Sequence, residues 1–137
     1  MTREELYKII PHREPMLLLD EAWAAEDGTA HGIYTVKGDE WFLQGHFPGN
    51  PIVPGVIQCE MAAQTCCVLI SGESEGKNPL FSGLDKVRFR AQVKPGDTLH
   101  FECIITKKRA PFFFAHATGR IENGSPCLSA DFSFALM

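Results

Sequence analysis

One histidine and one carboxylate in this chain have the types and the spacing for proton-transfer chemistry. His46 lies in a loop rich in glycine and proline, and Glu60 follows fourteen positions later in a mostly apolar run that predicts a helix. A histidine exchanges a proton near neutral pH, whereas a carboxyl group among apolar side chains holds its proton more readily than in water. Such a pair could remove a proton from one substrate atom and deliver a proton to another.

Two further residues of this stretch could assist the pair. Gly55 follows Pro54 at the predicted start of the helix, where a backbone amide has no partner inside the helix. Because glycine has no side chain, a carbonyl oxygen of a ligand could approach this amide closely and be polarised by it. Gln64 lies one helical turn after Glu60 and could hydrogen-bond its carboxylate. The stretch therefore offers a base, an acid and a carbonyl-polarising amide.

His46, Glu60 and Gln64 also have purely structural explanations. Glu60 could lie on a solvent-facing edge of the helix, with Gln64 beside it on the same wet stripe. A helix dipole would favour a carboxylate only in the first turn, and Glu60 lies beyond that turn if Pro54 begins the helix. His46 could be a surface residue in a rigid crossover, since three prolines within seven residues restrict the loop.

The remaining elements must position this stretch. Turn residues and hydrophobic periodicity predict a capped helix over residues 3–10, strands over 16–26 and 29–36, an irregular segment over 38–54 with a helical turn near 39–43, the apolar helix over 54–70, and strands over 80–93, 98–108, 112–122 and 126–136. A helix that is apolar on most sides is normally buried, and only a curved antiparallel sheet is available to bury it. The sequence therefore predicts an α+β fold of the hotdog type, in which one sheet wraps around one central helix.

Composition limits the class of protein. The 137 residues suit one compact domain over 1–137, with 45% hydrophobic and 22% charged residues. A net charge of −4 argues against general nucleic-acid binding. Five cysteines with no C-x-x-C pair predict reduced core thiols rather than disulfides or a zinc site. With no signal-peptide pattern and no apolar run long enough to span a membrane, we expect a cytoplasmic protein.

Other ionisable residues give weaker signals. Four histidines stand in unconnected contexts and are interpreted as structural or surface residues: His12, His31, His100 and His116. Three carboxylates are interpreted as turn or strand-edge residues: Asp20, Asp85 and Asp97. A basic corner is formed by Lys107, Lys108 and Arg109, with Arg88, Arg90 and Arg120 as possible neighbours. This corner is either a solvated hairpin end or an anion-docking patch.

The stretch GHFPGNPIVPGVIQCEMAAQ, Gly45 to Gln64, closely resembles the FabZ-like family of beta-hydroxyacyl-acyl carrier protein dehydratases. The family pattern is GHFPxxPxxPGVLxxEAxAQ, and here Ile57 replaces its leucine and Met61 the alanine after the glutamate. Two more segments look like the family's sequence, IIPHREPMLLLDEA at residues 9–22 and FSGLDKVRFRAQVKPGDTL at residues 81–99. The resemblance thus covers nearly the whole chain.

This resemblance implies a hotdog homodimer, often a trimer of dimers, that dehydrates (3R)-hydroxyacyl thioesters of acyl carrier protein to trans-2-enoyl thioesters in type II fatty acid synthesis. It makes His46 the catalytic histidine and Glu60 the catalytic carboxylate, supplied by opposite protomers. The Gly55 amide would polarise the thioester carbonyl, and Gln64 would orient Glu60. Glutamate at position 60 matches the simple dehydratases, since the dehydratase-isomerases carry aspartate there.

The resemblance implies no metal or organic cofactor, because the thioester itself serves as the electron sink. The acidic carrier protein and its phosphopantetheine arm would meet the basic corner of Lys107, Lys108 and Arg109. Two departures concern the acyl tunnel and its surroundings. Pro79 and Leu80 stand where the family commonly has a tyrosine near the tunnel mouth, and residues 111–114 are unusually aromatic.

Three other functions stay open on the sequence. One is a related hotdog dehydratase of a polyketide or other lipid pathway. Another is a non-catalytic hotdog module that binds acyl thioesters, which would not need His46 and Glu60 together. The third is thioester hydrolysis, which other hotdog proteins perform.

Overall fold

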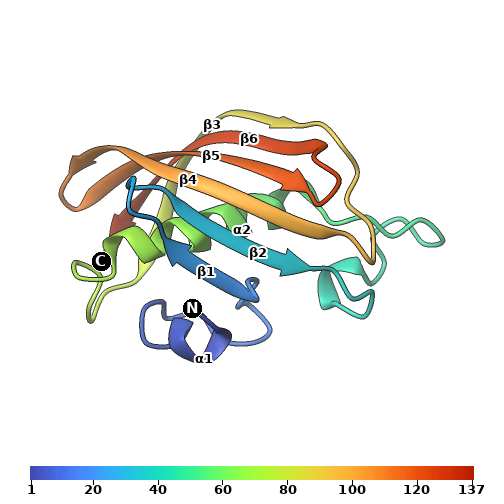
Figure 1. The fold of residues 1–137 in the computed structure, drawn as a ribbon, viewed down its shortest axis with the longest axis horizontal. Helices are drawn as coiled ribbons and strands as arrows, with labels where there is room; N and C mark the ends of the chain where they lie inside the picture. The colour runs from blue at the N-terminus through green and yellow to red at the C-terminus, as the bar shows by residue number, and fades with distance from the viewer.

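The structure, a computed structural model, describes residues 1–137 and consists of one antiparallel sheet curved over one main helix (Figure 1). The elements in chain order are α1 (Arg3–Leu6), β1 (Glu21–Ala24), β2 (Ala30–Thr35), the short helix η1 (Trp41–Leu43), α2 (Gly55–Cys66), its continuation η2 (Cys67–Ile70), β3 (Pro79–Phe89), β4 (Thr98–Arg109), β5 (Phe112–Ile121) and β6 (Pro126–Leu136). The six strands have the order β1-β2-β4-β5-β6-β3. The predicted architecture, one sheet around one central helix, is confirmed.

The core lies between α2 and the inner face of the sheet. Along β5, buried Phe113, Ala115 and Ala117 alternate with more exposed residues, as expected for a strand with one face against a core. The helix and β2 approach each other closely at Gly32. A Cβ atom at Gly32 would lie 2.1 Å from the Thr65 Oγ1 atom of α2, so only glycine permits this packing.

The first predicted strand is much shorter than expected. The sequence predicts a strand over residues 16–26, but β1 comprises only Glu21–Ala24. Leu17, Leu18 and Leu19 are buried. However, side chains rather than a neighbouring strand form hydrogen bonds with the backbone of this segment. The Gln64 side chain accepts a hydrogen bond from the amide of Leu18, and the Arg3 side chain donates one to the carbonyl of Leu17. The hydrophobic run therefore indicated burial correctly but not secondary structure.

Both predicted helices differ from the structure at their ends. Thr2 caps α1 as expected, because its Oγ1 accepts a hydrogen bond from the amide of Glu5. However, α1 ends at Leu6 rather than near residue 10. Pro54 is the N-cap of α2 rather than its first helical residue, and the helix tightens to a 3₁₀ turn after Cys66. Gly55 consequently becomes the first helical residue.

Strand β3 forms one edge of the sheet, since it pairs only with β6 (Figure 1). It ends at Phe89 rather than at residue 93, because the following chain turns to bond elsewhere: the amide of Val53 donates to the carbonyl of Val93. Four large apolar side chains of this edge are about half exposed: Leu80, Phe81, Leu84 and Phe89. Long exposed apolar edge strands favour association with another chain.

All five cysteines are free and buried, as expected for core thiols. Burial raises the pKa of the Cys127 thiol to about 11, so it stays protonated at neutral pH. Separately, none of the helices combines the length and the apolarity that crossing a membrane requires.

Candidate active site

The loop before α2 fixes the orientation and the tautomer of His46. The Nδ1 atom of His46 lies 2.8 Å from the backbone carbonyl oxygen of Ile52. A carbonyl oxygen only accepts hydrogen bonds, so Nδ1 carries the proton and donates it. In the neutral ring, Nε2 therefore keeps a free lone pair, as a general base requires. The loop reaches this shape through left-handed conformations at Gly45 (φ 78°), Phe47 (φ 53°) and Gly49 (φ 84°).

Gly55 lies in the same open groove as His46. The groove has a volume of about 540 Å³ and is lined by the loop, the start of α2, and the end of β3 with the chain that follows it. The amides of Gly55 and Val56 have no hydrogen-bond acceptor within the chain, as expected for the first residues of a helix. A Cβ atom at Gly55 would lie 2.6 Å from the ring of Phe89. The groove thus combines an imidazole with free amides at a helix N-terminus.

Glu60 lies in a second, smaller cavity. Its carboxylate accepts a hydrogen bond from the Gln64 Nε2 atom at 2.9 Å and lies 3.3 Å from the Nε2 atom of His12. The cavity lies between α2 and strands β3 and β6, and its volume of ≈ 20 Å³ has room for about one water molecule. The Glu60 side chain is 21% exposed, so it is reachable from outside while its orientation is fixed.

Gln64 connects this carboxylate to the rest of the fold. Its side chain is almost fully buried, and its Oε1 atom accepts from the amide of Leu18 at 2.9 Å. Its Nε2 atom donates to the carbonyl of Met16 at 2.8 Å as well as to Glu60. Gln64 therefore attaches the segment before β1 to α2 and aims one N–H at Glu60.

Replacing Gln64 by leucine should reduce the stability of the fold. The Leu18 amide would lose its acceptor in a buried place, and an unsatisfied buried group costs about 1–3 kcal/mol. Urea unfolding should show a loss in that range. If Gln64→Leu unfolds at the same urea concentration as the wild type, this connecting role is wrong.

Within one chain the candidate residues form two half-sites. His46 and Gly55 share the larger groove, Glu60 and Gln64 share the smaller cavity, and no hydrogen bond or ion pair joins His46 to Glu60. The two half-sites lie near opposite ends of β3. Phe89 lines the His46 groove, whereas Pro79 and Phe81 line the Glu60 cavity.

The interpretation of the other histidines as unconnected was wrong. His12 contacts Glu60 although 48 positions separate them in the sequence. His12 lies in the segment at residues 9–22, which resembles the family's sequence. That resemblance was the one indication in the sequence that His12 could belong to the site. His31 and His100 contact each other at 3.0 Å, and His116 contacts Asp131 at 2.7 Å.

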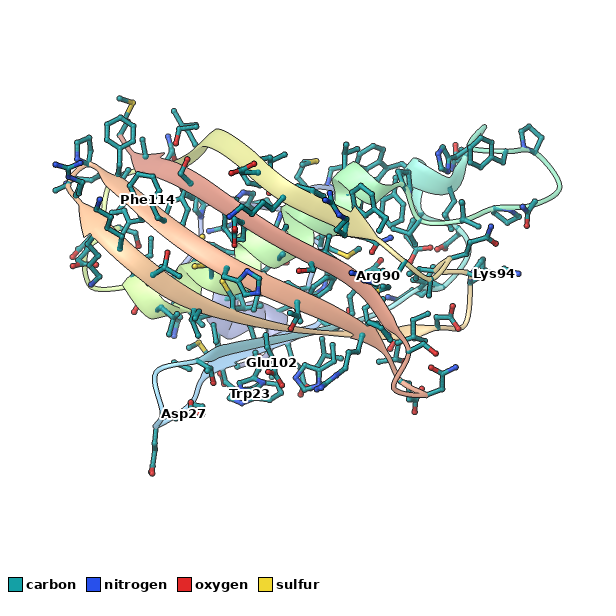
Figure 2. All side chains as sticks on the ribbon, turned by 90° about the horizontal axis from the view of Figure 1, so that it is seen from above. Trp23, Asp27, Arg90, Lys94, Glu102 and Phe114 are labelled. Atoms are coloured by element: carbon teal, nitrogen blue, oxygen red, sulfur yellow. The ribbon has the colours of Figure 1, made fainter.

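The basic corner is smaller than the sequence suggested. Strand pairing places Lys107 opposite Phe114 and Arg120 opposite His100, toward the other end of the same hairpin. Arg90 likewise lies far along the sheet from Phe114 (Figure 2). Lys108 contacts Glu73 at 3.2 Å, whereas Lys107 and Arg109 are exposed and form no ion pair. Arg88 lies opposite Ser129, which pairs with Thr118 rather than with Phe114. None of the three arginines considered as neighbours therefore extends this corner.

The three carboxylates interpreted as turn or strand-edge residues each accept a hydrogen bond from a backbone amide, as that interpretation predicts. Asp97 accepts a hydrogen bond from the amide of Lys94 within its turn, at 2.8 Å. Asp20 accepts from the amide of Thr35 at 2.9 Å, and Asp85 from the amide of Lys86 at 2.9 Å. None of the three lines either half-site.

Comparison with known proteins supports a common family for this chain and a set of dehydratases. The sequence pattern of the FabA-like domain matches residues 10–128. The 3-hydroxyacyl-[acyl-carrier-protein] dehydratase FabZ of Staphylococcus saprophyticus is 44% identical over 135 residues, which cover 96% of this chain and 92% of that protein.

Solved structures show the same fold at lower sequence identity. A chain of the dehydratase heterocomplex ApeI:P from Xenorhabdus doucetiae has a TM-score of 0.80 at 20% identity, covering 96% of this chain and 90% of that chain. A hypothetical thioesterase from Streptococcus pneumoniae, solved with coenzyme A, has a TM-score of 0.63 at 14% identity, covering 85% and 84%. Since dehydratases and thioesterases share this fold, the fold alone does not select the reaction.

Proposed function

The chain belongs to the FabZ group of 3-hydroxyacyl-[acyl-carrier-protein] dehydratases within the FabA-like family, and we propose that it converts (3R)-hydroxyacyl thioesters to trans-2-enoyl thioesters in type II fatty acid synthesis. In this proposal residues 1–137 act as one catalytic domain. The observation that carries it is the hydrogen bond from His46 Nδ1 to the Ile52 carbonyl. It leaves Nε2 free as a base beside the unpaired amides at the start of α2.

The first half of the reaction takes place in the His46 groove. His46 Nε2 removes the C2 proton of the substrate, and negative charge develops on the thioester oxygen. The Gly55 amide donates to that oxygen, a type of contact worth about 10²–10³ in rate. The electron pair from the broken C–H bond forms the C2–C3 double bond as the C3–O bond breaks.

The leaving hydroxyl group takes its proton from Glu60, directly or through a water molecule in the Glu60 cavity, and departs as water. The products are one enoyl thioester and one water molecule. Return of the proton from His46 to Glu60 through solvent restores both groups. The hydrogen bond from Gln64 and the contact with His12 keep the Glu60 carboxyl group aimed at the cavity during this cycle.

We propose that each complete site combines His46 of one subunit with Glu60 of the partner subunit. The position of the half-sites along β3 supports this arrangement. In a two-fold symmetric dimer that pairs two β3 edges antiparallel, the start of one strand lies beside the end of the other. The Glu60 cavity, at the start of β3, would then face the partner's His46 groove, at its end. The half-exposed apolar side chains of β3 would be buried by the same contact.

Assembly into a trimer of dimers and a cytoplasmic location remain parts of the proposal. Five buried, unpaired thiols fit a reducing compartment. Sedimentation of the purified protein and fractionation of cells that express it would test these two points separately.

The acyl carrier protein is proposed to dock at Lys107, Lys108 and Arg109. Because Lys108 already contacts Glu73, Lys107 and Arg109 offer the free charges. Lys107→Glu should raise KM for a carrier-protein substrate by about threefold to tenfold and leave KM for a short N-acetylcysteamine thioester unchanged. Lys8→Glu, an equal charge change at another exposed position, serves as the control. Equal effects on both substrates would count against this docking surface.

A single assay with a (3R)-hydroxyacyl thioester tests the proposed reaction against its alternatives. Dehydration increases enoyl absorbance and releases no thiol, hydrolysis releases free thiol, and a binding module does neither. We expect enoyl formation alone. Thiol release without enoyl product, or binding without turnover, would contradict the proposed function. Substrates of several chain lengths in the same assay would show how Pro79 and Leu80 affect the acyl range.

A further inference from the structure

Three side chains of types that can bind a metal ion lie together on the outer face of the sheet, away from α2. His31 of β2 is paired with Glu102 of β4 and with Trp23 of β1, and His100 lies two positions before Glu102. One ligand atom each from His31, His100 and Glu102 lies within 4.8 Å of the others. Figure 2 shows Trp23 and Glu102 near each other on this part of the sheet. The proposed dehydration does not use these side chains.

Hydrogen bonds fix the tautomer of His31. The Thr29 hydroxyl group donates to the Asp27 carboxylate at 2.7 Å, so its oxygen accepts from His31 Nε2 at 3.0 Å. With its proton on Nε2, the neutral ring of His31 presents a bare lone pair on Nδ1 toward His100 Nε2, 3.0 Å away. A histidine that binds a metal typically donates its other ring N–H to such an acceptor.

The spacing of the two nitrogens also allows a shared ion, once both rings turn so that their lone pairs point away from the line that joins the nitrogens. Nitrogens about 2.1 Å from one ion and 3.0 Å from each other subtend about 90° at that ion. A right angle fits the octahedral or square arrangements of Ni²⁺ and Cu²⁺ better than tetrahedral Zn²⁺. We propose that His31 Nδ1, His100 Nε2 and Glu102 form a binding site for a divalent transition-metal ion of the Ni²⁺ and Cu²⁺ type.

Two neighbours shape this site. The Trp23 ring stacks on the His31 ring with centroids 5.2 Å apart, which covers one side of the cluster. Arg120 donates to Glu102 Oε1 at 3.1 Å. Its positive charge competes with a cation for the carboxylate, although Oε2 has no partner within the chain. The charge of Arg120 therefore lowers the affinity of the site without blocking it. The neutral His100 ring carries its one proton on Nε2, toward His31. In binding, that proton moves through solvent to Nδ1 of the same ring, so Nε2 is freed for the ion and no net proton is released.

The test is a titration of the tag-free full-length protein with Ni²⁺, followed by calorimetry and by tryptophan fluorescence. We expect one ion per chain, and quenching of Trp23, which stacks on a ligand. His100→Gln and Glu102→Gln should each weaken binding by at least about tenfold, and Thr29→Val by about 10–100-fold through the loss of the acceptor for His31. Arg120→Gln should instead tighten binding, because it removes the competing charge.

Matched controls separate the site from general metal binding. His116→Gln, which changes another outer-face histidine outside the cluster, should leave the affinity unchanged. Trp23→Phe should keep the heat of binding while the quenching disappears, since Trp41 lies elsewhere. Absence of one-to-one Ni²⁺ binding, or wild-type affinity in His100→Gln and Glu102→Gln, would overturn the proposal. These readouts do not depend on dehydratase activity, so either proposal can fail without the other.

Discussion

Replacing His46 by alanine or Glu60 by glutamine should each reduce kcat for dehydration by about 10²–10⁴. Alanine removes the Nε2 lone pair that the Ile52 hydrogen bond keeps free. Glutamine keeps the size and the hydrogen bonding of Glu60 but cannot deliver a proton to the leaving hydroxyl group. The measurement is steady-state enoyl formation from a (3R)-hydroxyacyl thioester.

Two controls accompany this prediction. His116→Ala removes a histidine of the outer sheet face and should keep full activity. Urea unfolding of each variant distinguishes a chemical loss from a folding defect. Full activity of His46→Ala or of Glu60→Gln, in folded protein, would show that the assigned mechanism is wrong.

Gly55→Ala should lower kcat/KM by about 10²–10³, the value of one contact to a developing oxyanion. A Cβ atom here would meet the Phe89 ring at 2.6 Å and would stand beside the amide that the thioester oxygen approaches. The same clash should reduce stability by no more than about 1 kcal/mol, because the Phe89 ring is half exposed and can turn aside. Kinetics with a short thioester and urea unfolding measure the two effects.

The double variant Gly55→Ala/Phe89→Leu distinguishes the two causes. Leucine at position 89 makes room for the Cβ atom, so stability should largely return. Activity should stay low, because the methyl group still obstructs the approach of the oxygen. Recovery of activity together with stability would mean that Gly55 serves packing only.

The sheet around one helix could be predicted from the sequence because the strands that form it have strong periodic patterns. The pattern of β5, for example, alternates buried and exposed residues over its whole length. The segment before β1 could not be predicted in the same way. Its leucines are buried, but the backbone amide of Leu18 donates to the side chain of Gln64, 46 positions later, rather than to a neighbouring strand. Periodicity reports burial and carries no information on which partner satisfies the backbone.

The candidate site could also be predicted only in part from the sequence. His46, Gly55, Glu60 and Gln64 are near each other in sequence, so their types and spacing suggested chemistry. His12 lies 48 positions from Glu60, and only folding brings its ring within 3.3 Å of the carboxylate. His31 and His100 are similarly joined by the register of β2 and β4, which no local pattern specifies.

The proposal that a complete site spans two subunits has one direct test. Chains carrying His46→Ala and chains carrying Glu60→Gln are coexpressed with different affinity tags, and the mixed dimer is purified. With His46 and Glu60 supplied by opposite subunits, one of its two sites keeps both groups, so kcat per dimer should return to about half of the wild-type value. If both groups act within one chain, every site carries a defect. Activity no higher than that of the single variants would then contradict the shared site.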